Sequence, residues 1–137
     1  MPKITHLLET ALYVDDMERA VAFYRDILGL DLLESWERGS VLAAGPEQVL
    51  LLFRRGSTVN GVDTPGGRIP PHDGAGPVHL AFAIDAASLP SWEEHLIAHG
   101  VAIESRIDWR RGGRSLYFRD PDGHSVELAT PGVWPVY

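Results

Sequence analysis

Apolar and polar residues along the chain form one pattern that occurs twice. Residues 9–15 form a short apolar run between polar ends, as expected for a strand, and residues 79–85 repeat this order at an offset of 70 residues. A helical spacing of apolar residues follows each strand and ends at a glycine, Gly29 in the first copy and Gly100 in the second. Three short apolar runs, separated by turn residues, follow each helix. The chain therefore predicts the succession of strand, helix and three strands, twice over.

The repeat predicts an α+β fold with two tandem βαβββ modules in a single domain, residues 1–137. Module one covers about residues 5–54, module two covers about residues 77–131, and a linker rich in Gly and Pro spans about residues 55–76. A linker of this length is unusual inside a compact domain. It is either a connection that runs over the surface between the modules or a loop that closes over a site, and its composition leaves both interpretations open. Asp15, with Glu18 in the first turn, is a capping signal for the first helix.

Strand side chains alternate between two faces, which separates a face covered by helix from an open face. In the second module the bulky residues at positions 80, 82 and 84 are expected under the helix, which puts His79 on the open face. By the same alternation Glu9 in the first strand and Glu127 in the last strand face away from the helices. The expected helix-facing positions of those two strands are Thr10, Leu12, Val14, Val126 and Leu128. The strand before the last adds three residues to the open face, namely Ser115, Tyr117 and Arg119.

Two carboxylates and an imidazole on one open face make a candidate metal site. Glu9 and Glu127 would repel each other unless a cation neutralised them, and with His79 they suit one divalent ion of Fe, Mn, Ni, Co or Zn. The chain has no cysteine, so His, Asp and Glu are the side chains left to bind a metal. The alternative is that each residue is solvated or hydrogen-bonded, which is commoner for a single His or Glu on a strand.

The composition is that of a packed globular protein with an acidic surface. Apolar residues make up 45% of the 137 residues and charged residues 23%, which argues against disorder. A net charge of −7 without a cluster of Lys and Arg argues against nucleic acid and anionic membranes as partners. The longest apolar run, Val49–Phe53, is too short to span a bilayer. We therefore expect a soluble, cytoplasmic protein that acts on a small molecule.

Four residues are candidates for substrate contacts. Tyr117 and Arg114 belong to the strand before the last, Trp109 to the loop ahead of that strand, and His72 to the linker. Arg114 suits a carboxylate or phosphonate, unless it is a surface cation. His72 would serve as an acid or base if the linker closes over a site, unless it is an exposed loop residue. The remaining histidines receive no function, namely His6, His95, His99 and His124.

Two motifs resemble the signatures of the vicinal oxygen chelate superfamily. The first is Tyr-Val-Asp-Asp-Met-Glu-Arg-Ala-Val-Ala-Phe-Tyr at residues 13–24, and the second is Arg-Asp-Pro-Asp-Gly-His-Ser-Val-Glu-Leu at residues 119–128. This superfamily includes glyoxalase I, fosfomycin-resistance and bleomycin-resistance proteins, and ring-cleaving extradiol dioxygenases. The resemblance covers about residues 5–131. It implies paired modules that form a cup-shaped mixed sheet, with metal ligands at Glu9, His79 and Glu127.

The implied ligand set departs from familiar members of this superfamily. Extradiol enzymes and fosfomycin-type proteins usually carry His where this chain has Glu9, and glyoxalase I usually carries Glu near the position of Leu50 or Leu51. A site with three ligands would leave coordination positions open for a substrate that binds through two adjacent oxygens. The resemblance thus implies lyase or isomerase chemistry with Glu127 also acting as the catalytic base, or ring-cleaving dioxygenation.

The missing fourth ligand and the tryptophans favour an alternative function. Trp36, Trp109 and Trp134 could line an apolar cup in a metal-free protein of the bleomycin-resistance type, which binds a small molecule, whereas Trp92 fits the core face of the second helix. The resemblance also implies a homodimer. In such a dimer Glu9 would join His79 and Glu127 of either the same chain or the other one, and the sequence leaves both arrangements open.

Overall fold

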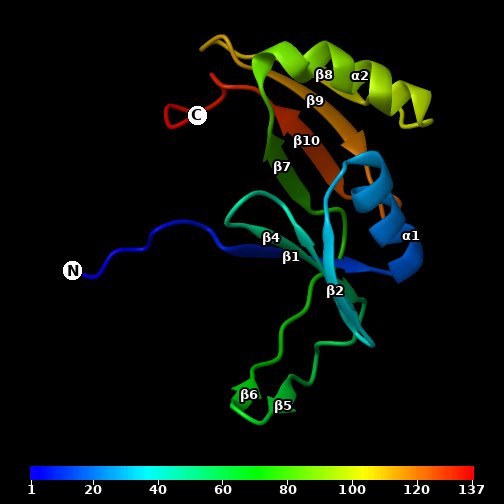
Figure 1. Cartoon of the computed structure of the whole chain (residues 1–137), viewed down its shortest axis with the longest axis vertical. Helices are drawn as coiled ribbons and strands as arrows, with labels where there is room; N and C mark the ends of the chain where they lie inside the picture. Colours follow the sequence, from blue (N-terminus) through cyan, green and yellow to red (C-terminus); the bar gives the residue numbers. More distant parts are fainter. The chain divides into compact units, whose positions relative to one another are not determined.

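The computed structural model describes all residues, 1–137, and they form two compact units, Met1–Ala75 and Gly76–Tyr137 (Figure 1). Each unit holds one copy of the predicted succession of strand, helix and three strands. The α+β class with tandem βαβββ modules, expected from the repeat, is therefore confirmed. None of the helices has the length and apolar character needed to cross a membrane.

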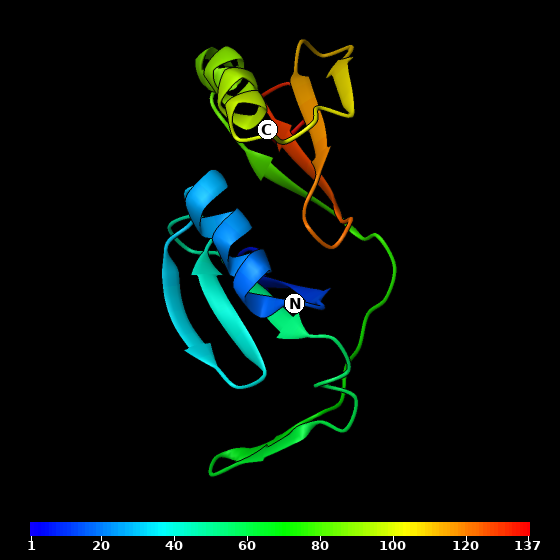
Figure 2. The ribbon, with the colours of Figure 1, turned by 90° about the vertical axis from the view of Figure 1, so that its right-hand side faces the viewer.

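The first unit is a four-stranded sheet with a helix on one face. The strand order is β1-β4-β3-β2, in which β1 runs parallel to β4 and the other neighbours are antiparallel. The helix packs against β3 and β4, and Figure 2 shows it lying across the sheet. In chain order the elements are β1 (Glu9–Val14), α1 (Met17–Ala22), a π-helical turn η1 (Phe23–Ile27), β2 (Leu32–Trp36), β3 (Gly39–Ala43) and β4 (Val49–Arg54).

The start of α1 differs by one residue from the expected capping site. The Asp16 side chain accepts a hydrogen bond from the backbone N–H of Arg19 at 3.0 Å, so Asp16 is the N-cap. Asp15, the residue expected in that role, instead pairs with Arg55 at 2.7 Å between Nε and Oδ1. Two successive aspartates offer the same chemistry, and the backbone of Asp16, extended at φ −119° and ψ 107°, decides which one caps the helix.

The alternation of faces in β1 holds for its second half. Leu12 and Val14 are buried under α1 as expected. Thr10, expected on the same face, is instead exposed. Ala11 and Tyr13 are half-buried and face the other side of the sheet.

The linker belongs to the first unit and contains a short hairpin that the sequence did not predict. Strands β5 (Val62–Thr64) and β6 (Gly67–Ile69) pair antiparallel. Each strand has three residues, too few for a recognisable alternation of polarity. The two ends of the linker are joined by Thr58, whose hydroxyl donates to the His72 carbonyl at 2.5 Å while the His72 N–H donates to the Thr58 carbonyl at 3.1 Å.

The second unit repeats the topology of the first. Its strand order is β7-β10-β9-β8, with β7 parallel to β10 and the other pairs antiparallel. Val126 and Leu128 are buried on the helix-facing side, as expected. Its elements are β7 (His79–Ala83), a 3-10 turn η2 (Ala86–Ser88), α2 (Leu89–Ala98), β8 (Ser105–Asp108), β9 (Arg114–Arg119) and β10 (Ser125–Ala129).

The turn between β9 and β10 is held by a buried aspartate and a buried histidine. Oδ1 of Asp120 accepts hydrogen bonds from the backbone N–H groups of Asp122 at 3.0 Å and His124 at 2.9 Å. Its Oδ2 lies 2.7 Å from Nδ1 of the His124 ring. Both side chains are almost fully buried, so His124 is a structural residue of the turn.

Candidate functional site

A cluster of polar side chains lies on the face of the second sheet that α2 does not cover. It contains His79 from β7, Glu127 from β10, and Tyr117 and Ser115 from β9. Strand β10 lies between the other two, and Glu127 is directly opposite Tyr117 in the register. Same-face neighbours on adjacent strands are close enough for their side chains to touch. The sheet thus brings together these four residues, which are distant in the sequence.

Glu127 is a buried carboxylate whose orientation is set by other side chains. Only 5% of the residue is exposed. Its Oε1 accepts a hydrogen bond from the Ser115 hydroxyl at 2.5 Å, and that hydroxyl in turn accepts one from Nε1 of Trp109 at 2.7 Å. A serine hydroxyl has one proton to donate and lone pairs to accept with, so it can make both bonds at once. This chain holds one oxygen of Glu127 and leaves Oε2 for another partner.

His79 turns a nitrogen toward that second oxygen. Its Nδ1 lies 3.0 Å from the backbone carbonyl of Ser125, which can only accept, so Nδ1 carries the proton of the bond. In a neutral imidazole Nε2 then bears a lone pair, and it lies 3.3 Å from Oε2 of Glu127. Two atoms with lone pairs face each other at this distance, and a proton or a metal ion is needed to make the contact favourable.

Tyr117 adds a protonated hydroxyl to the same cluster. Burial, together with hydrogen bonding to Glu127 and the negative charge of that carboxylate, raises the pKa of Tyr117 to about 12, against a smaller opposing effect of Ser115. The phenol ring also stacks on His79, with centroids 5.9 Å apart and an interplanar angle of 23°. Tyr117 is therefore a hydrogen-bond donor at neutral pH.

These residues fit a divalent metal ion in their chemistry and their supporting contacts. An imidazole whose other nitrogen donates to a carbonyl, beside a carboxylate whose other oxygen is hydrogen-bonded, is the arrangement that orients metal ligands in proteins. In the second unit His79 and Glu127 have these supporting contacts and could hold a metal ion. No group of three or more His, Asp or Glu side chains gathers closely enough in the structure to hold a metal. The further protein ligand expected from the sequence, Glu9, belongs to the first unit.

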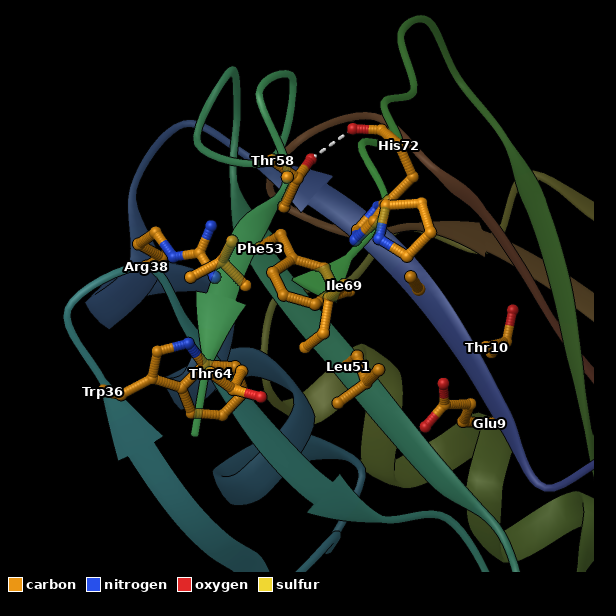
Figure 3. Close-up of a pocket in the computed structure, with 14 residues that line it drawn as sticks. Glu9, Thr10, Trp36, Arg38, Leu51, Phe53, Thr58, Thr64, Ile69 and His72 are labelled. Carbon is orange, nitrogen blue, oxygen red and sulfur yellow. Dashed lines mark hydrogen bonds between the residues drawn. The ribbon is translucent and has the colours of Figure 1, made fainter. Parts of the chain in front are cut away.

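Glu9 lies in a pocket of the first unit, shown in Figure 3, with a volume of about 600 Å³. The floor is the face of the sheet opposite α1, and the linker hairpin provides a wall. Linker residues between Thr58 and His72 contribute to the lining. The lining residues are Glu9, Thr10, Ala11, Trp36, Arg38, Leu51, Phe53, Thr58, Gly61, Val62, Thr64, Ile69, Pro70 and His72.

His72 lines this pocket and is held by Tyr13. The Tyr13 hydroxyl lies 2.6 Å from Nδ1 of His72, and the His72 ring meets Phe53 edge to face, with centroids 5.0 Å apart. Burial, followed by the charge of Asp73, raises the pKa of Tyr13, while Thr58 opposes the change. The phenol of Tyr13 therefore keeps its proton at neutral pH and lies within hydrogen-bond distance of Nδ1 of His72.

The remaining arginine candidates are occupied by carboxylates of the chain. Nε of Arg114 pairs with Asp108 at 2.8 Å, and both side chains are exposed. Arg119 contacts Glu104 through two nitrogens, at 2.6 and 2.9 Å. Sequence reasoning missed Arg38, which lines the pocket of the first unit. The signal for it was slight, because Arg38 precedes Gly39 in what reads as an ordinary turn between strands.

The chain belongs to the Glyoxalase/Bleomycin resistance protein/Dioxygenase superfamily, whose family model matches residues 3–128. The resemblance seen in the two sequence motifs is thus confirmed. A solved structure of lactoylglutathione lyase from Agrobacterium tumefaciens superposes with a TM-score of 0.88 and 33% identity, covering 98% of this chain and 99% of that one.

Characterised relatives in this superfamily carry the names of several enzymes. Glutathione transferase FosA of Serratia marcescens is 30% identical over 131 residues, which cover 93% of this chain and 80% of the relative. Metallothiol transferase FosB of Staphylococcus epidermidis is 30% identical over 129 residues, covering 93% and 83%. Catechol-2,3-dioxygenase of Bacillus subtilis is 28% identical over 125 residues, covering 90% of this chain but 41% of the relative.

Proposed function

We propose that the chain is a divalent-metal-dependent enzyme whose small substrate binds the metal through two adjacent oxygens. The proposed ligands are His79, Glu127 and Glu9, and the ion is one of Fe, Mn, Ni, Co or Zn. The observation that carries the proposal is the 3.3 Å contact between Nε2 of His79 and Oε2 of Glu127, two potential ligand atoms oriented by bonds to Ser125 and Ser115. A bound metal would act as a Lewis acid on the substrate oxygens.

The residues of the second unit have distinct tasks in this proposal. Ser115 keeps Glu127 in one orientation, so that its Oε2 can receive a proton from the substrate as well as bind the ion. Tyr117 keeps its hydroxyl proton at neutral pH in a hydrogen bond to Glu127, and its oxygen can accept a hydrogen bond from the substrate. Trp109 contributes its ring at the edge of the cluster and its N–H to Ser115. Arg114, the remaining sequence candidate, precedes Ser115 on β9 and therefore takes the opposite face of the sheet, where it pairs with Asp108. It has no contact with a substrate bound at the cluster in this proposal.

The relatives' names favour some reactions over others. Lactoylglutathione lyase, glutathione transferase and metallothiol transferase are all named for reactions of thiol compounds. Thiol transfer is a reaction class that the sequence interpretation did not include. The relative named as a dioxygenase is matched over less than half of its length. We therefore rank lyase or transferase chemistry ahead of ring cleavage.

Metal binding by the untagged protein tests the proposal. We expect elemental analysis or calorimetric titration with Mn²⁺, Co²⁺, Ni²⁺ and Zn²⁺ to show one ion per chain, and His79→Ala and Glu127→Gln to abolish it. His6→Ala and Glu94→Gln are matched controls, since both residues are exposed and lie outside the cluster. The metal-dependent function would be refuted if the protein took up none of these four ions and also failed to take up Fe²⁺ under anaerobic conditions.

The third ligand can be assigned by mixing variants. Glu9→Gln is expected to weaken metal binding about tenfold or more. We also propose a homodimer, and mixing Glu9→Gln chains with His79→Ala chains shows which chain completes each site. Recovery of metal binding in the mixture means that Glu9 of one chain joins His79 of the other. Weak binding by both variants and by their mixture means that one chain supplies all three ligands.

A metal-free binding protein of the bleomycin-resistance type is the second candidate function. It is supported by Leu51, which lines the pocket beside Glu9 where glyoxalase I usually has a carboxylate, and by the apolar walls around it. Ligand binding with unchanged affinity in the presence of excess chelator would favour this function.

A further inference from the structure

The pocket of the first unit combines apolar walls with one arginine. We propose that this pocket binds a small anionic compound with an apolar body, and that Arg38 holds the anionic group. This inference deepens the proposed function by naming the class of substrate, and it rests on that function only in calling the ligand a substrate. It depends on residues of the first unit alone.

The walls expose large apolar side chains to the space they enclose. Trp36 from β2 is 39% exposed and Ile69 from β6 is 49% exposed, and both line the pocket together with the half-buried Leu51 of β4. Phe53 lies beneath them and meets Trp36 edge to face at 6.1 Å between centroids. Apolar surface gathered from separate elements is costly to leave in water, and a volume of about 600 Å³ suits a small molecule.

Arg38 supplies the positive charge in this apolar surrounding. Its Nη1 donates to the backbone carbonyl of Ser57 at 3.0 Å, and no carboxylate of the chain pairs with it. The backbone carbonyl of Arg38 is held by the N–H of Arg54 at 2.8 Å. The guanidinium is thus anchored on one side, with N–H groups left to bind a carboxylate, sulfonate or phosphonate in a fixed geometry.

The charges in the pocket assign an orientation to the ligand. Figure 3 shows Arg38 and Glu9 at opposite ends of the space, with Phe53 and Ile69 between them. An anion is attracted to the Arg38 end and repelled from the carboxylate of Glu9. The apolar body then lies against the aromatic walls, and the far end of the ligand points toward Glu9, the proposed metal ligand.

The wall contributed by the linker is held in place by contacts within the first unit. Thr58 and His72 exchange two hydrogen bonds across the linker, and the His72 ring packs on Phe53. Gly74 also lies against the Tyr13 ring so closely that an added Cβ would come within 2.5 Å of it. A preformed wall reduces the entropy cost of binding, so measurable affinity is expected for a probe that is not the natural substrate.

Two fluorescent probes that differ by one charge test this inference. Anilinonaphthalene sulfonate carries a sulfonate on an aromatic body, and N-phenylnaphthylamine has the same body without it. Both are titrated into the full chain in the presence of a chelator. Arg38→Gln is expected to weaken sulfonate binding about tenfold and to leave the neutral probe unchanged. Arg54→Gln makes the same change in net charge on an exposed residue outside the pocket and is expected to alter neither.

Filling the pocket tests where the probes bind. Ala11 lines the pocket, so Ala11→Phe is expected to abolish binding of both probes. If circular dichroism shows that this variant does not fold, Ile69→Ala, which truncates a half-exposed side chain, is expected to weaken both probes several-fold. The assignment would be overturned if Arg38→Gln changed the affinity for the sulfonate probe no more than Arg54→Gln does. It would also be overturned if Arg38→Gln weakened the binding of both probes equally. Unchanged binding by both pocket variants would overturn it as well.

The outcomes separate this inference from the proposed function. Metal uptake depends on His79 and Glu127, whereas probe binding is measured without metal and depends on the first unit. Probe binding without metal uptake would leave the pocket assignment standing and favour the metal-free binding protein. Metal uptake without the Arg38 effect would refute the ligand class alone.

Discussion

Replacing Ser115 by Ala tests whether Glu127 is held as the structure shows. The variant removes the hydrogen bond that the serine hydroxyl donates to Oε1 of Glu127 at 2.5 Å, and only 5% of Glu127 is exposed for water to take its place. A hydrogen bond to a charged group contributes about 1.5–3 kcal/mol. Trp109 also loses its acceptor, but at 36% exposure its N–H can bind water instead. We therefore expect Ser115→Ala to lower the free energy of unfolding by about 1.5–3 kcal/mol, almost all of it through Glu127.

Urea unfolding followed by circular dichroism and tryptophan fluorescence measures this change. A Trp36→Phe background leaves the tryptophans of the second unit as the fluorescent probes. Ser125→Ala is the matched control, because Ser125 contacts His79 through its backbone carbonyl and its hydroxyl can be removed without loss of that bond. The control is expected to change the free energy of unfolding by less than about 0.5 kcal/mol.

A double-mutant cycle with Glu127→Gln isolates the pair. The coupling free energy between Ser115 and Glu127 should account for most of the loss in free energy of unfolding caused by Ser115→Ala. A loss of stability no larger than that of the Ser125 control, or a coupling energy near zero, would show that the serine does not hold the carboxylate. The orientation of Glu127 as a metal ligand would then lose its structural basis. In the metal-loaded protein the same variant should weaken metal affinity about 10–100-fold.

Further predictions concern other buried contacts of the second unit. Asp120→Ala leaves the buried backbone N–H and ring of His124 without an acceptor and should destabilise the protein by about 3–5 kcal/mol in urea unfolding; a loss below about 1 kcal/mol would contradict this account of the turn. In an absorbance titration of tyrosinate, the Tyr117 phenol should ionise at a pH of about 12, above the ordinary value of 10.0. Glu127→Gln should lower that midpoint because it removes the negative charge. A midpoint equal to that of the parent protein would exclude the Glu127 carboxylate as a cause of the raised pKa. Gly113→Ala should lower the melting temperature markedly, because the new Cβ would lie 2.4 Å from a backbone carbon of the C-terminal segment; a variant as stable as the parent would show that this segment can move aside.

Much of the fold was predictable because its determinants are local. Period-two and helical patterns, with Gly29 and Gly100 as helix ends at φ +74° and +73°, depend on residues close together in the sequence. The predictions were wrong or missing where neighbouring residues offered the same chemistry or where an element was too short. Asp15 and Asp16 could both cap α1, and the three-residue strands of the linker hairpin are too short to show a pattern.

The candidate site divides in the same way. Alternation along single strands was enough to predict that His79, Tyr117 and Glu127 share a face, because a strand determines which side each residue takes. It could not show the bond from Ser115 to Glu127 or the position of Arg38. Those depend on which strands are neighbours, on their register and on how the linker folds back.

The sequence by itself determined the repeated modules and the superfamily, and it named the candidate metal ligands. Each of these follows from residue types at fixed spacing along one chain segment. Tertiary structure decided that Glu127 is buried and oriented, that His79 presents Nε2 to it, and that the linker closes a pocket in which Arg38 is the cation. The physical reason is that burial, hydrogen-bond partners and electrostatic surroundings are properties of side chains brought together from distant positions, and no local pattern encodes them.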